Sequence, residues 1–378
     1  MRWTRWAAGL GLVISVSVPA GRAGGAAQVE QTSLQVAGRE LVATADLPVL
    51  LAGVNRAGTE YACAQGWGIF DGPSTAASIA AIRAFGADTI RVPLNEDCWL
   101  GVNVPPTFSG AVYRRAITRY VRTIEAGGMA VVLDLHWGAP GSAPALGQEA
   151  MPDAGHAVPF WHSVATTFGG DPRVLYELFN EPHDVTWRCW DLGCTMPGGW
   201  RAAGMQQLVD TIRATGAPQP IIADWLAWGN DLTGFLGHRP VDPLHRLVAG
   251  FHVYPWSGCS SVTCWDRQVA PVAAAVPVVT TEVGTRACNG AFASTYLSWA
   301  GAHHISSIAW VWDTNEGCYD LVHDYAGAPT AYGSAVRAGL LRLRGQSAAL
   351  PSGPVPAAPA APAGPAPPSP GAPAAGAG

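Results

Sequence analysis

The feature of this sequence that most restricts its fold is a series of eight short apolar runs that alternate with longer helical patterns. The runs are rich in β-branched residues and show little polar alternation, which is typical of strands buried on both faces of a parallel sheet. They occupy residues 49–54, 87–94, 129–136, 174–181, 220–225, 247–254, 277–284 and 305–313. Eight β/α units in about 300 residues predict an α/β fold, the (β/α)8 TIM barrel.

Helical periodicity fills the segments between the runs, and only the crossover near residues 232–236 has a weak pattern. The helical segments are 74–86, 111–127, 160–169, 199–215, 265–275, 292–303 and 330–342. A doubly wound sheet is the alternative fold. It is disfavoured because no G-x-G-x-x-G motif follows the first run.

Composition limits the classes of function. Hydrophobic residues make up 49% of the chain and charged residues 13%, so a large core can form and global disorder is excluded. The net charge of -5 excludes a broadly basic nucleic-acid binder.

The ends of the chain differ from its middle. Residues 1–27 combine Arg2 and Arg5 with a short apolar run, as in a secretory signal peptide. That run is shorter than the ~18 residues of a membrane span, so we expect a secreted protein with no membrane attachment after cleavage. We expect residues 28–45 to lead into a catalytic domain at 46–345, and the Pro/Ala-rich segment 346–378 to be a disordered tail. The protein is expected to be a monomer.

Polar and aromatic residues end most of the apolar runs. In a TIM barrel the active site is built at these carboxyl ends, so their composition tests for function. The residues at these ends are Arg91, His136, Trp137, Asn180, Glu181, His252, Tyr254, Glu282 and Trp312.

Two glutamates, Glu181 and Glu282, end the fourth and seventh runs. A pair of carboxyl groups is what glycoside cleavage requires, one to attack or stabilise the anomeric carbon and one to protonate the leaving oxygen. The structural alternative for either glutamate is a salt bridge with Arg91 or Arg286. Glu177 lies deeper on the same run as Glu181, so we expect it to be a buried partner of an arginine, and we expect Asp134, two residues before His136, to be a structural or supporting acid.

These residues carry a resemblance to glycoside hydrolase family 5, the cellulase-type retaining enzymes. It covers nearly all of residues 46–345 and rests on Gly53-Val54-Asn55, on Leu178-Phe179-Asn180-Glu181-Pro182, and on the ordered set from Arg91 to Trp312.

The resemblance implies a role for each residue at the barrel rim. Glu181 would be the acid/base and Glu282 the nucleophile. Arg91 would hold Glu282 ionised, Tyr254 would donate a hydrogen bond to it, and His252 would help to position the carboxylates. Asn180 would bind a sugar hydroxyl, and His136 and Trp312 would line the subsite of the reacting sugar. Trp137 stands where the family often has His or Asn, which leaves that subsite undefined.

The environments of the two glutamates are expected to differ. Glu282, beside Arg91 and Tyr254, should be the anion, whereas Glu181 faces that anion in a partly desolvated cleft and should be protonated. Tryptophans in the loops are expected either to pack those loops or to form stacking platforms for a linear glycan. These are Trp67, Trp99, Trp187, Trp190, Trp228, Trp256 and Trp265, with Trp225 at the end of the fifth run.

Eight cysteines in an exported chain suggest disulfides. Cys63 and Cys98 lie in loops after adjacent strands, as do Cys288 and Cys318, so each pair can meet on one barrel face. Cys189 with Cys194 and Cys259 with Cys264 can close locally through a C-x4-C spacing. A four-cysteine zinc site is the alternative, disfavoured by this spacing and by export.

The sequence therefore predicts a secreted, retaining endo-glycosidase that acts on a polysaccharide or oligosaccharide, with no cofactor and no metal. The leading substrate is a β-1,4-glucan, and the alternatives are β-mannan, a glycolipid or a β-1,3/1,6-glucan. From other classes, a non-catalytic carbohydrate-binding barrel would not need both glutamates. A metal-dependent hydrolase barrel would need His and acid ligands, such as His-x-His after the first run, which are absent there.

Overall fold

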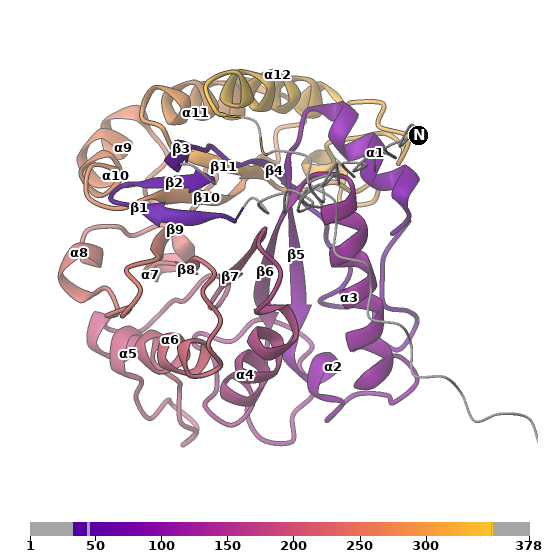
Figure 1. Ribbon diagram of the computed structural model, residues 1–378, viewed down its shortest axis with the longest axis vertical. Helices are drawn as coiled ribbons and strands as arrows, with labels where there is room; N and C mark the ends of the chain where they lie inside the picture. Colours follow the sequence, from indigo (N-terminus) through magenta and orange to yellow (C-terminus); the bar gives the residue numbers. More distant parts are fainter. Residues whose placement is uncertain (1–32, 44–45, 349, 351–378) are drawn as a thin grey trace, which may run out of the picture.

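Eight parallel strands close into a barrel in the computed structural model, which describes residues 33–43, 46–348 and 350 (Figure 1). Neighbouring strands follow the order β10-β11-β4-β5-β6-β7-β8-β9. The strands are β4 (Ala52–Asn55), β5 (Thr89–Asn95), β6 (Ala130–Trp137), β7 (Val174–Glu177), β8 (Ile221–Ala223), β9 (Leu247–Val253), β10 (Val278–Val283) and β11 (Ser306–Ala309). Each predicted apolar run overlaps one of them, and the predicted (β/α)8 barrel is confirmed.

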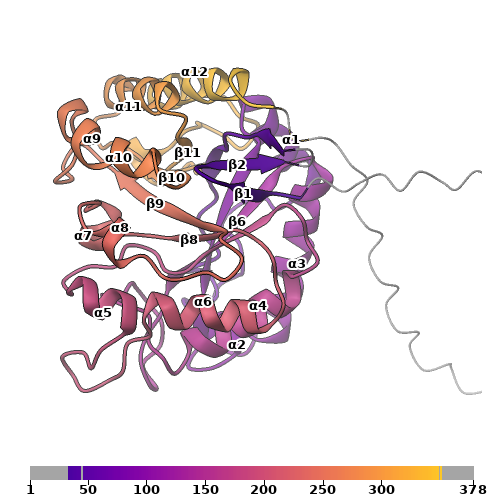
Figure 2. The same ribbon diagram turned by 60° about the vertical axis from the view of Figure 1, so that its left-hand side comes forward.

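The helices lie around the outside of this barrel (Figures 1 and 2). They are α1 (Ala76–Phe85), α2 (Glu96–Leu100), α3 (Ala111–Ala126), α4 (Ala157–Phe168), α5 (Trp187–Leu192), α6 (Met205–Ala214), α7 (Leu226–Gly229), α8 (Phe235–His238), α9 (Val262–Gln268), α10 (Ala270–Ala273), α11 (Ala291–Ala302) and α12 (Ala331–Gly345). No helix in the described part of the chain is long and apolar enough to cross a membrane.

Most of the predicted helices are present. The segment 265–275 is divided between α9 and α10. The short helices α2, α5 and α7, which lie in loops after strands, were not predicted from the sequence. The predicted signal peptide lies outside the described residues, as does the predicted tail apart from residues 346–348 and 350.

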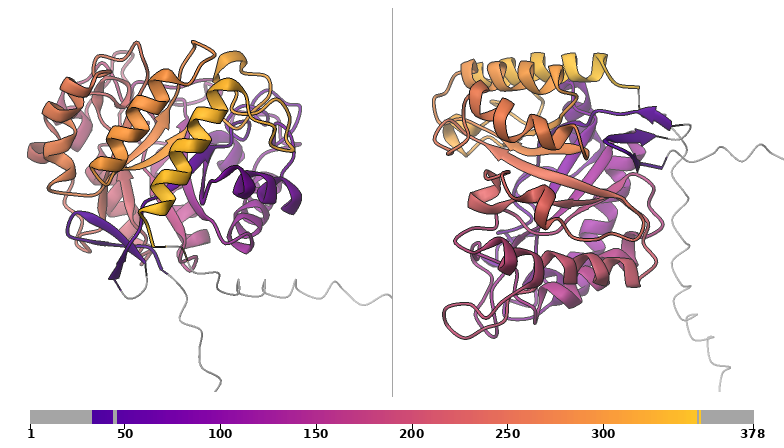
Figure 3. Two further views of the ribbon diagram at one scale, coloured as in Figure 1. Left: turned by 90° about the horizontal axis from the view of Figure 1, so that it is seen from above. Right: turned by 90° about the vertical axis from the view of Figure 1, so that its left-hand side faces the viewer.

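The predicted lead-in contains part of a small antiparallel sheet, formed by β1 (Gln35–Ala37), β2 (Glu40–Ala43) and β3 (Leu47–Pro48). Figure 3 shows β1 and β2 in indigo at one end of the barrel, away from the loops that follow the barrel strands. Leu34 and Leu41 pack there with inward-facing strand residues such as Val132 and Leu175. The lead-in therefore closes the barrel floor with apolar side chains, which places the polar residues at the opposite end.

A buried polar layer lies above this apolar floor. Its side chains are fully buried and come from successive strands: Asn55, Arg91, Asp134, Glu177, Asp224 and His252. Gly250 makes room for this layer, because a Cβ there would lie 1.8 Å from Oδ1 of Asp224. Buried charges must be paired to be tolerated, so these residues form one network beneath the rim.

Four disulfides fix the loops on the rim: Cys63–Cys98, Cys189–Cys194, Cys259–Cys264 and Cys288–Cys318. They are the pairs that loop adjacency and the C-x4-C spacing suggested. No cysteine is free in the described residues, so these sulfurs form no zinc site.

Candidate active site

A cleft of about 640 Å³ opens at the carboxyl ends of the strands. Glu181 and Glu282 lie in its wall together with histidine, asparagine and several aromatic side chains. The lining residues are His136, Asn180, Glu181, Ala227, Trp228, Tyr254, Trp256, Ser257, Gly258, Glu282, Arg286, Trp310 and Tyr319. The structure thus brings the two predicted glutamates into one site.

Glu181 lies just beyond β7, which ends at Glu177. The intervening backbone is held by the Trp161 indole, which donates to Leu178 O (2.9 Å), and by Asn180 N, which donates to Leu135 O (3.0 Å). Glu181 itself has a φ of 51°, a left-handed conformation that costs a non-glycine residue about 1 kcal/mol. Such strain is concentrated at functional sites, where the surroundings hold it in place.

Glu282 lies on β10, next to an irregularity in the pairing with β9 between Thr280 and Glu282. A bulge of this kind can re-aim a side chain. The Tyr254 hydroxyl donates to Glu282 Oε2 (2.5 Å), and Arg91 Nη1 donates to Oε1 (2.8 Å). Both contacts stabilise a negative charge on Glu282 and fix the orientation of its carboxylate.

Arg91 is the centre of the buried network. Its Nε and Nη2 pair with the two oxygens of Glu177 (2.6 and 2.9 Å). Its other partners are Asn55, Asp134, Asn180 and Glu282. Burial lowers the pKa of Arg91, but these carboxylates raise it well above its ordinary value, so the guanidinium stays charged. The expectation that Glu177 is a buried partner of an arginine is confirmed.

His252 bridges the two candidate catalytic glutamates. Its Nδ1 lies 2.9 Å from Glu181 Oε1 and 3.6 Å from Glu282 Oε2. Burial lowers the pKa of His252, but Glu282, Glu177 and Glu181 raise it well above the ordinary histidine value. The imidazole is therefore positively charged at neutral pH.

This charge changes the expected protonation of Glu181. Burial raises the pKa of Glu181, but the hydrogen bond and charge of His252 lower it more, so the net shift is downward. This downward shift runs against the expectation that Glu181 is the protonated partner in the free protein, which did not include a positively charged His252. The group whose pKa is raised is His252, one hydrogen bond away from the Glu181 carboxylate.

His136 forms another part of the cleft wall. Its Nδ1 lies 2.6 Å from Asp134 Oδ2, and its ring stacks on Trp310 at 5.7 Å between centroids. Burial lowers the pKa of His136, which favours the neutral imidazole. Asp134 contacts both His136 and Arg91, which agrees with the structural or supporting role expected of it.

Two predicted tryptophans lie elsewhere. Trp312 is fully buried and packs edge-on against Phe85 (5.2 Å), so the expectation that it lines the subsite is wrong. Trp310 occupies the cleft instead, because β11 ends at Ala309 and the alternation assumed from the sequence stops there. Trp137 is partly buried beside Tyr61 (6.2 Å) and is not among the residues lining the cleft.

The loop tryptophans differ in exposure, and Trp187 is intermediate. Trp99, Trp190, Trp225 and Trp265 are buried, whereas Trp67, Trp228 and Trp256 are about half exposed. Trp228 and Trp256 line the cleft. Trp228 stacks on His183 at 3.6 Å, and the Arg286 guanidinium lies over Trp256 at 4.6 Å. Flat, half-exposed rings of this kind can stack on the C–H faces of sugars.

Sequence reasoning missed Gln148, which supports the site from the loop after β6. It accepts a hydrogen bond from Asn180 Nδ2 (2.6 Å) and donates one to the Glu181 carbonyl oxygen (2.9 Å). Nothing in the sequence around Gln148 signals this role. The loop after β6 therefore helps to hold the backbone of Glu181.

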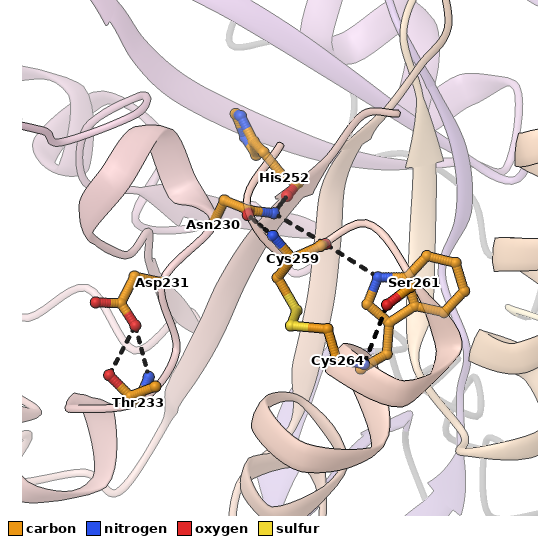
Figure 4. Close-up of a disulfide and its surroundings, with 8 residues drawn as sticks. Asn230, Asp231, Thr233, His252, Cys259, Ser261 and Cys264 are labelled. Carbon is orange, nitrogen blue, oxygen red and sulfur yellow. Dashed lines mark hydrogen bonds between the residues drawn. A yellow bond between two sulfur atoms is a disulfide. The ribbon is translucent and has the colours of Figure 1, made fainter. Parts of the chain in front are cut away.

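The loop after β9 is fixed beside His252 in a comparable way (Figure 4). Asn230 Nδ2 donates to the His252 carbonyl oxygen (2.8 Å), and Asn230 Oδ1 accepts from Cys259 N (2.6 Å). The Cys259–Cys264 disulfide is thus joined to the backbone of His252 through one asparagine.

Two clusters of carboxylates and an imidazole in this region have spacings that could hold a metal ion. One consists of Glu181, His252 and Glu282, and the other, below it, of Glu177, Asp224 and His252. Both contain His252, whose positive charge repels a cation, and Arg91 already pairs with Glu177 and Glu282. The arrangement favours acid–base and nucleophilic chemistry at the cleft over metal chemistry.

Comparison with protein families gives one match over most of the chain. Residues 48–316 match the family described as cellulase (glycosyl hydrolase family 5). The chain is 27% identical over 224 residues to the manganese dependent endoglucanase Eg5A of Phanerodontia chrysosporium, an overlap of 54% of this chain and 53% of that protein. It is 27% identical over 219 residues to endoglucanase 1 of Saitozyma flava, covering 54% of this chain and 60% of the relative. The chain thus spans about half of these relatives.

Solved structures share the fold. The β-glucanase SdGluc5_26A of Saccharophagus degradans superposes with a TM-score of 0.65 at 20% identity, covering 83% of this chain and 94% of that one. A β-mannanase of Streptomyces thermolilacinus with mannohexaose gives 0.62 at 23% identity, covering 84% and 97%.

Proposed function

Since the chain belongs to glycosyl hydrolase family 5, we propose that it is a secreted endo-glycosidase that cleaves β-1,4-glucan by double displacement with retention of configuration. In this proposal Glu282 is the nucleophile and Glu181 is the acid/base. Residues 46–345 form the catalytic domain, and the protein acts as a monomer. The four disulfides support export, because such bonds persist in oxidising compartments.

The spacing of Glu181 and Glu282 is the observation that carries this proposal. An oxygen of each carboxyl group and a nitrogen of His252 all lie within 4.8 Å of one another. Retaining glycosidases have carboxyl groups ~5–5.5 Å apart, whereas inverting enzymes leave ~6.5–9.5 Å for a water molecule. The short distance therefore supports direct attack by one glutamate.

In the first step, a Glu282 oxygen attacks the anomeric carbon and the bond from that carbon to the leaving oxygen breaks. Glu181 first takes the proton of His252, whose Nδ1 lies 2.9 Å away, and passes it to the leaving oxygen, so that the step ends with Glu181 as a carboxylate and His252 neutral. Arg91 and Tyr254 hold the carboxylate in position until it attacks.

In the second step, water attacks the glycosyl–Glu282 ester at the anomeric carbon and Glu181 accepts the proton of that water. The carbon–oxygen bond to Glu282 breaks, which releases the sugar and restores the carboxylate. Asn180 lies within the cleft wall, held by Arg91 and Gln148, where it can bind a hydroxyl of the reacting sugar.

Glucan is the leading substrate, supported by the endoglucanase names of the relatives, and mannan is the second candidate, supported by the β-mannanase that shares the fold. Incubation with soluble β-1,4-glucan and β-1,4-mannan, following viscosity and reducing ends together, tests both. We expect glucan viscosity to fall faster than reducing ends accumulate. Cleavage of mannan alone would make mannan, and not glucan, the proposed substrate. Release of single sugars at unchanged viscosity would contradict endo action.

A further inference from the structure

A second cluster of charged side chains lies on the rim of the barrel, outside the cleft. Glu96 follows β5 at the start of α2, and Asp153 and His156 end the long loop between β6 and α4. An oxygen of Glu96, an oxygen of Asp153 and a nitrogen of His156 all lie within 4.8 Å of one another. None of the three lines the cleft.

Each carboxylate of this cluster uses one oxygen to accept hydrogen bonds from the backbone. Glu96 Oε1 accepts from Ala139 N (2.8 Å), while Asp153 Oδ1 accepts from Gly155 N (2.9 Å) and His156 N (3.0 Å). The remaining atoms, Glu96 Oε2 and Asp153 Oδ2, are buried and have no hydrogen-bond partner among the described residues. Glu96 is 0% exposed and Asp153 4%, so water does not readily solvate them.

The negative charge of the cluster is poorly compensated. Among the ion pairs of the described residues, Glu96 and Asp153 pair only with His156, at 3.8 and 3.5 Å. Asp97 adds a further carboxylate nearby. Two carboxylates this close together and this deeply buried cannot both carry a charge without a compensating cation.

The donor geometry suits a metal ion. His156 Nδ1 donates to the Ala139 carbonyl oxygen (3.0 Å) and lies 3.5 Å from Asp153 Oδ2 and 3.8 Å from Glu96 Oε1, so an ion bound by Nδ1 would displace its proton. Ligands that share an ion at ~2.1 Å lie about 3 to 4 Å apart. His156 keeps 18% of its side chain exposed, which gives an ion a path into the site.

From these observations we propose that Glu96, Asp153 and His156, with the Ala139 carbonyl oxygen, bind one divalent cation that accepts mixed oxygen and nitrogen ligands, as Mn²⁺ does. Ca²⁺ prefers oxygen ligands alone and should bind more weakly. The ion joins the start of α2 to both ends of the 138–156 loop. That loop carries Gln148, which contacts Asn180 and the Glu181 backbone. The bound cation thus stabilises the 138–156 loop, which supports the active site, and it does not enter the cleft.

Titration of the purified full chain with Mn²⁺, followed by electron paramagnetic resonance, tests the proposal. We expect one ion per chain in the wild type and at least a tenfold loss of affinity in Glu96→Gln and Asp153→Asn, since even outer-shell changes cost about 10- to 100-fold. Asp210→Asn is the matched control, because it removes an exposed carboxylate on α6 and should bind as the wild type does. Absence of Mn²⁺ binding by the wild type, or equal affinity in all variants, would overturn the proposal.

The position of the ion provides a second measurement that does not depend on the folding of the variants. Anomalous scattering from wild-type crystals grown with Mn²⁺ should give a peak between Glu96, Asp153 and His156. A peak found only between Glu181 and Glu282 would show that the cleft binds the ion and would refute the site. The same ion should raise the Tm of the wild type and leave that of Glu96→Gln unchanged.

Discussion

Replacing Tyr254 with Phe removes one hydroxyl from the site and leaves the aromatic ring that lines the cleft. That hydroxyl donates to Glu282 Oε2 at 2.5 Å, while the ring stacks on Trp256 at 4.9 Å. Burial and the charges of Glu282 and Glu181 raise the pKa of Tyr254 well above its ordinary value, so the hydroxyl remains a donor throughout the working pH range. The variant therefore tests one hydrogen bond to the proposed nucleophile.

The size of the effect follows from the charge on Glu282. A hydrogen bond to a charged group contributes about 1.5–3 kcal/mol. If the bond holds the carboxylate in its attacking orientation, kcat should fall by about 10- to 150-fold, because each 1.4 kcal/mol is about a factor of ten. KM should change little, because the ring that lines the cleft is retained.

Initial rates on a soluble glucan and on an aryl glycoside measure this loss. Tyr296→Phe is the matched control, since its hydroxyl bonds to Thr280 in the buried core, away from the cleft. That control should lose about 1 kcal/mol of stability and keep its kcat. A wild-type kcat in Tyr254→Phe, or an equal loss in both variants, would refute the reasoning.

Three further perturbations test other parts of the account. His252→Asn should move the basic limb of the kcat/KM profile to lower pH. In the wild type, activity is lost as pH rises through the raised pKa of His252, whereas in the variant Glu181 alone holds the proton. A basic limb at the same pH in both proteins would contradict the transfer of a proton from His252 to Glu181. Loss of the Cys63–Cys98 disulfide, which spans 35 residues, should lower the free energy of unfolding in denaturant by about 4 kcal/mol. Loss of the Cys259–Cys264 disulfide, which spans 5, should lower it by about 2 kcal/mol. The reverse order would exclude loop-closure entropy as the cause of the stabilisation. Trp228→Ala should raise KM for long oligosaccharides about three- to tenfold and affect short ones less, if its half-exposed ring is a stacking platform; equal effects on both would assign Trp228 a purely structural role.

The barrel could be predicted because its strands are buried on both faces and so appear as continuous apolar runs. The β1–β3 sheet could not, because its strands have two to four residues and are partly exposed, which leaves no apolar run. The helices α2 and α5 have five and six residues, too few to show helical periodicity.

The candidate site was predictable where side chains alternate regularly along a strand, as for Arg91 and His252. It was not predictable where regular alternation ends, as after Ala309, where Trp310 and not Trp312 enters the cleft. The protonation of Glu181 depends on a contact with His252 from a distant strand, and a one-dimensional pattern does not contain that distance.

Covalent trapping of the nucleophile tests the central claim most directly. An activated 2-fluoro glycoside forms a slowly hydrolysed ester with the attacking carboxylate, and peptide mass spectrometry identifies the labelled residue. The account predicts a single label on Glu282, lost in Glu282→Gln and retained in Glu181→Gln, with retained configuration in the early product by NMR. A label on Glu181 or Glu177, or an inverted product, would contradict it.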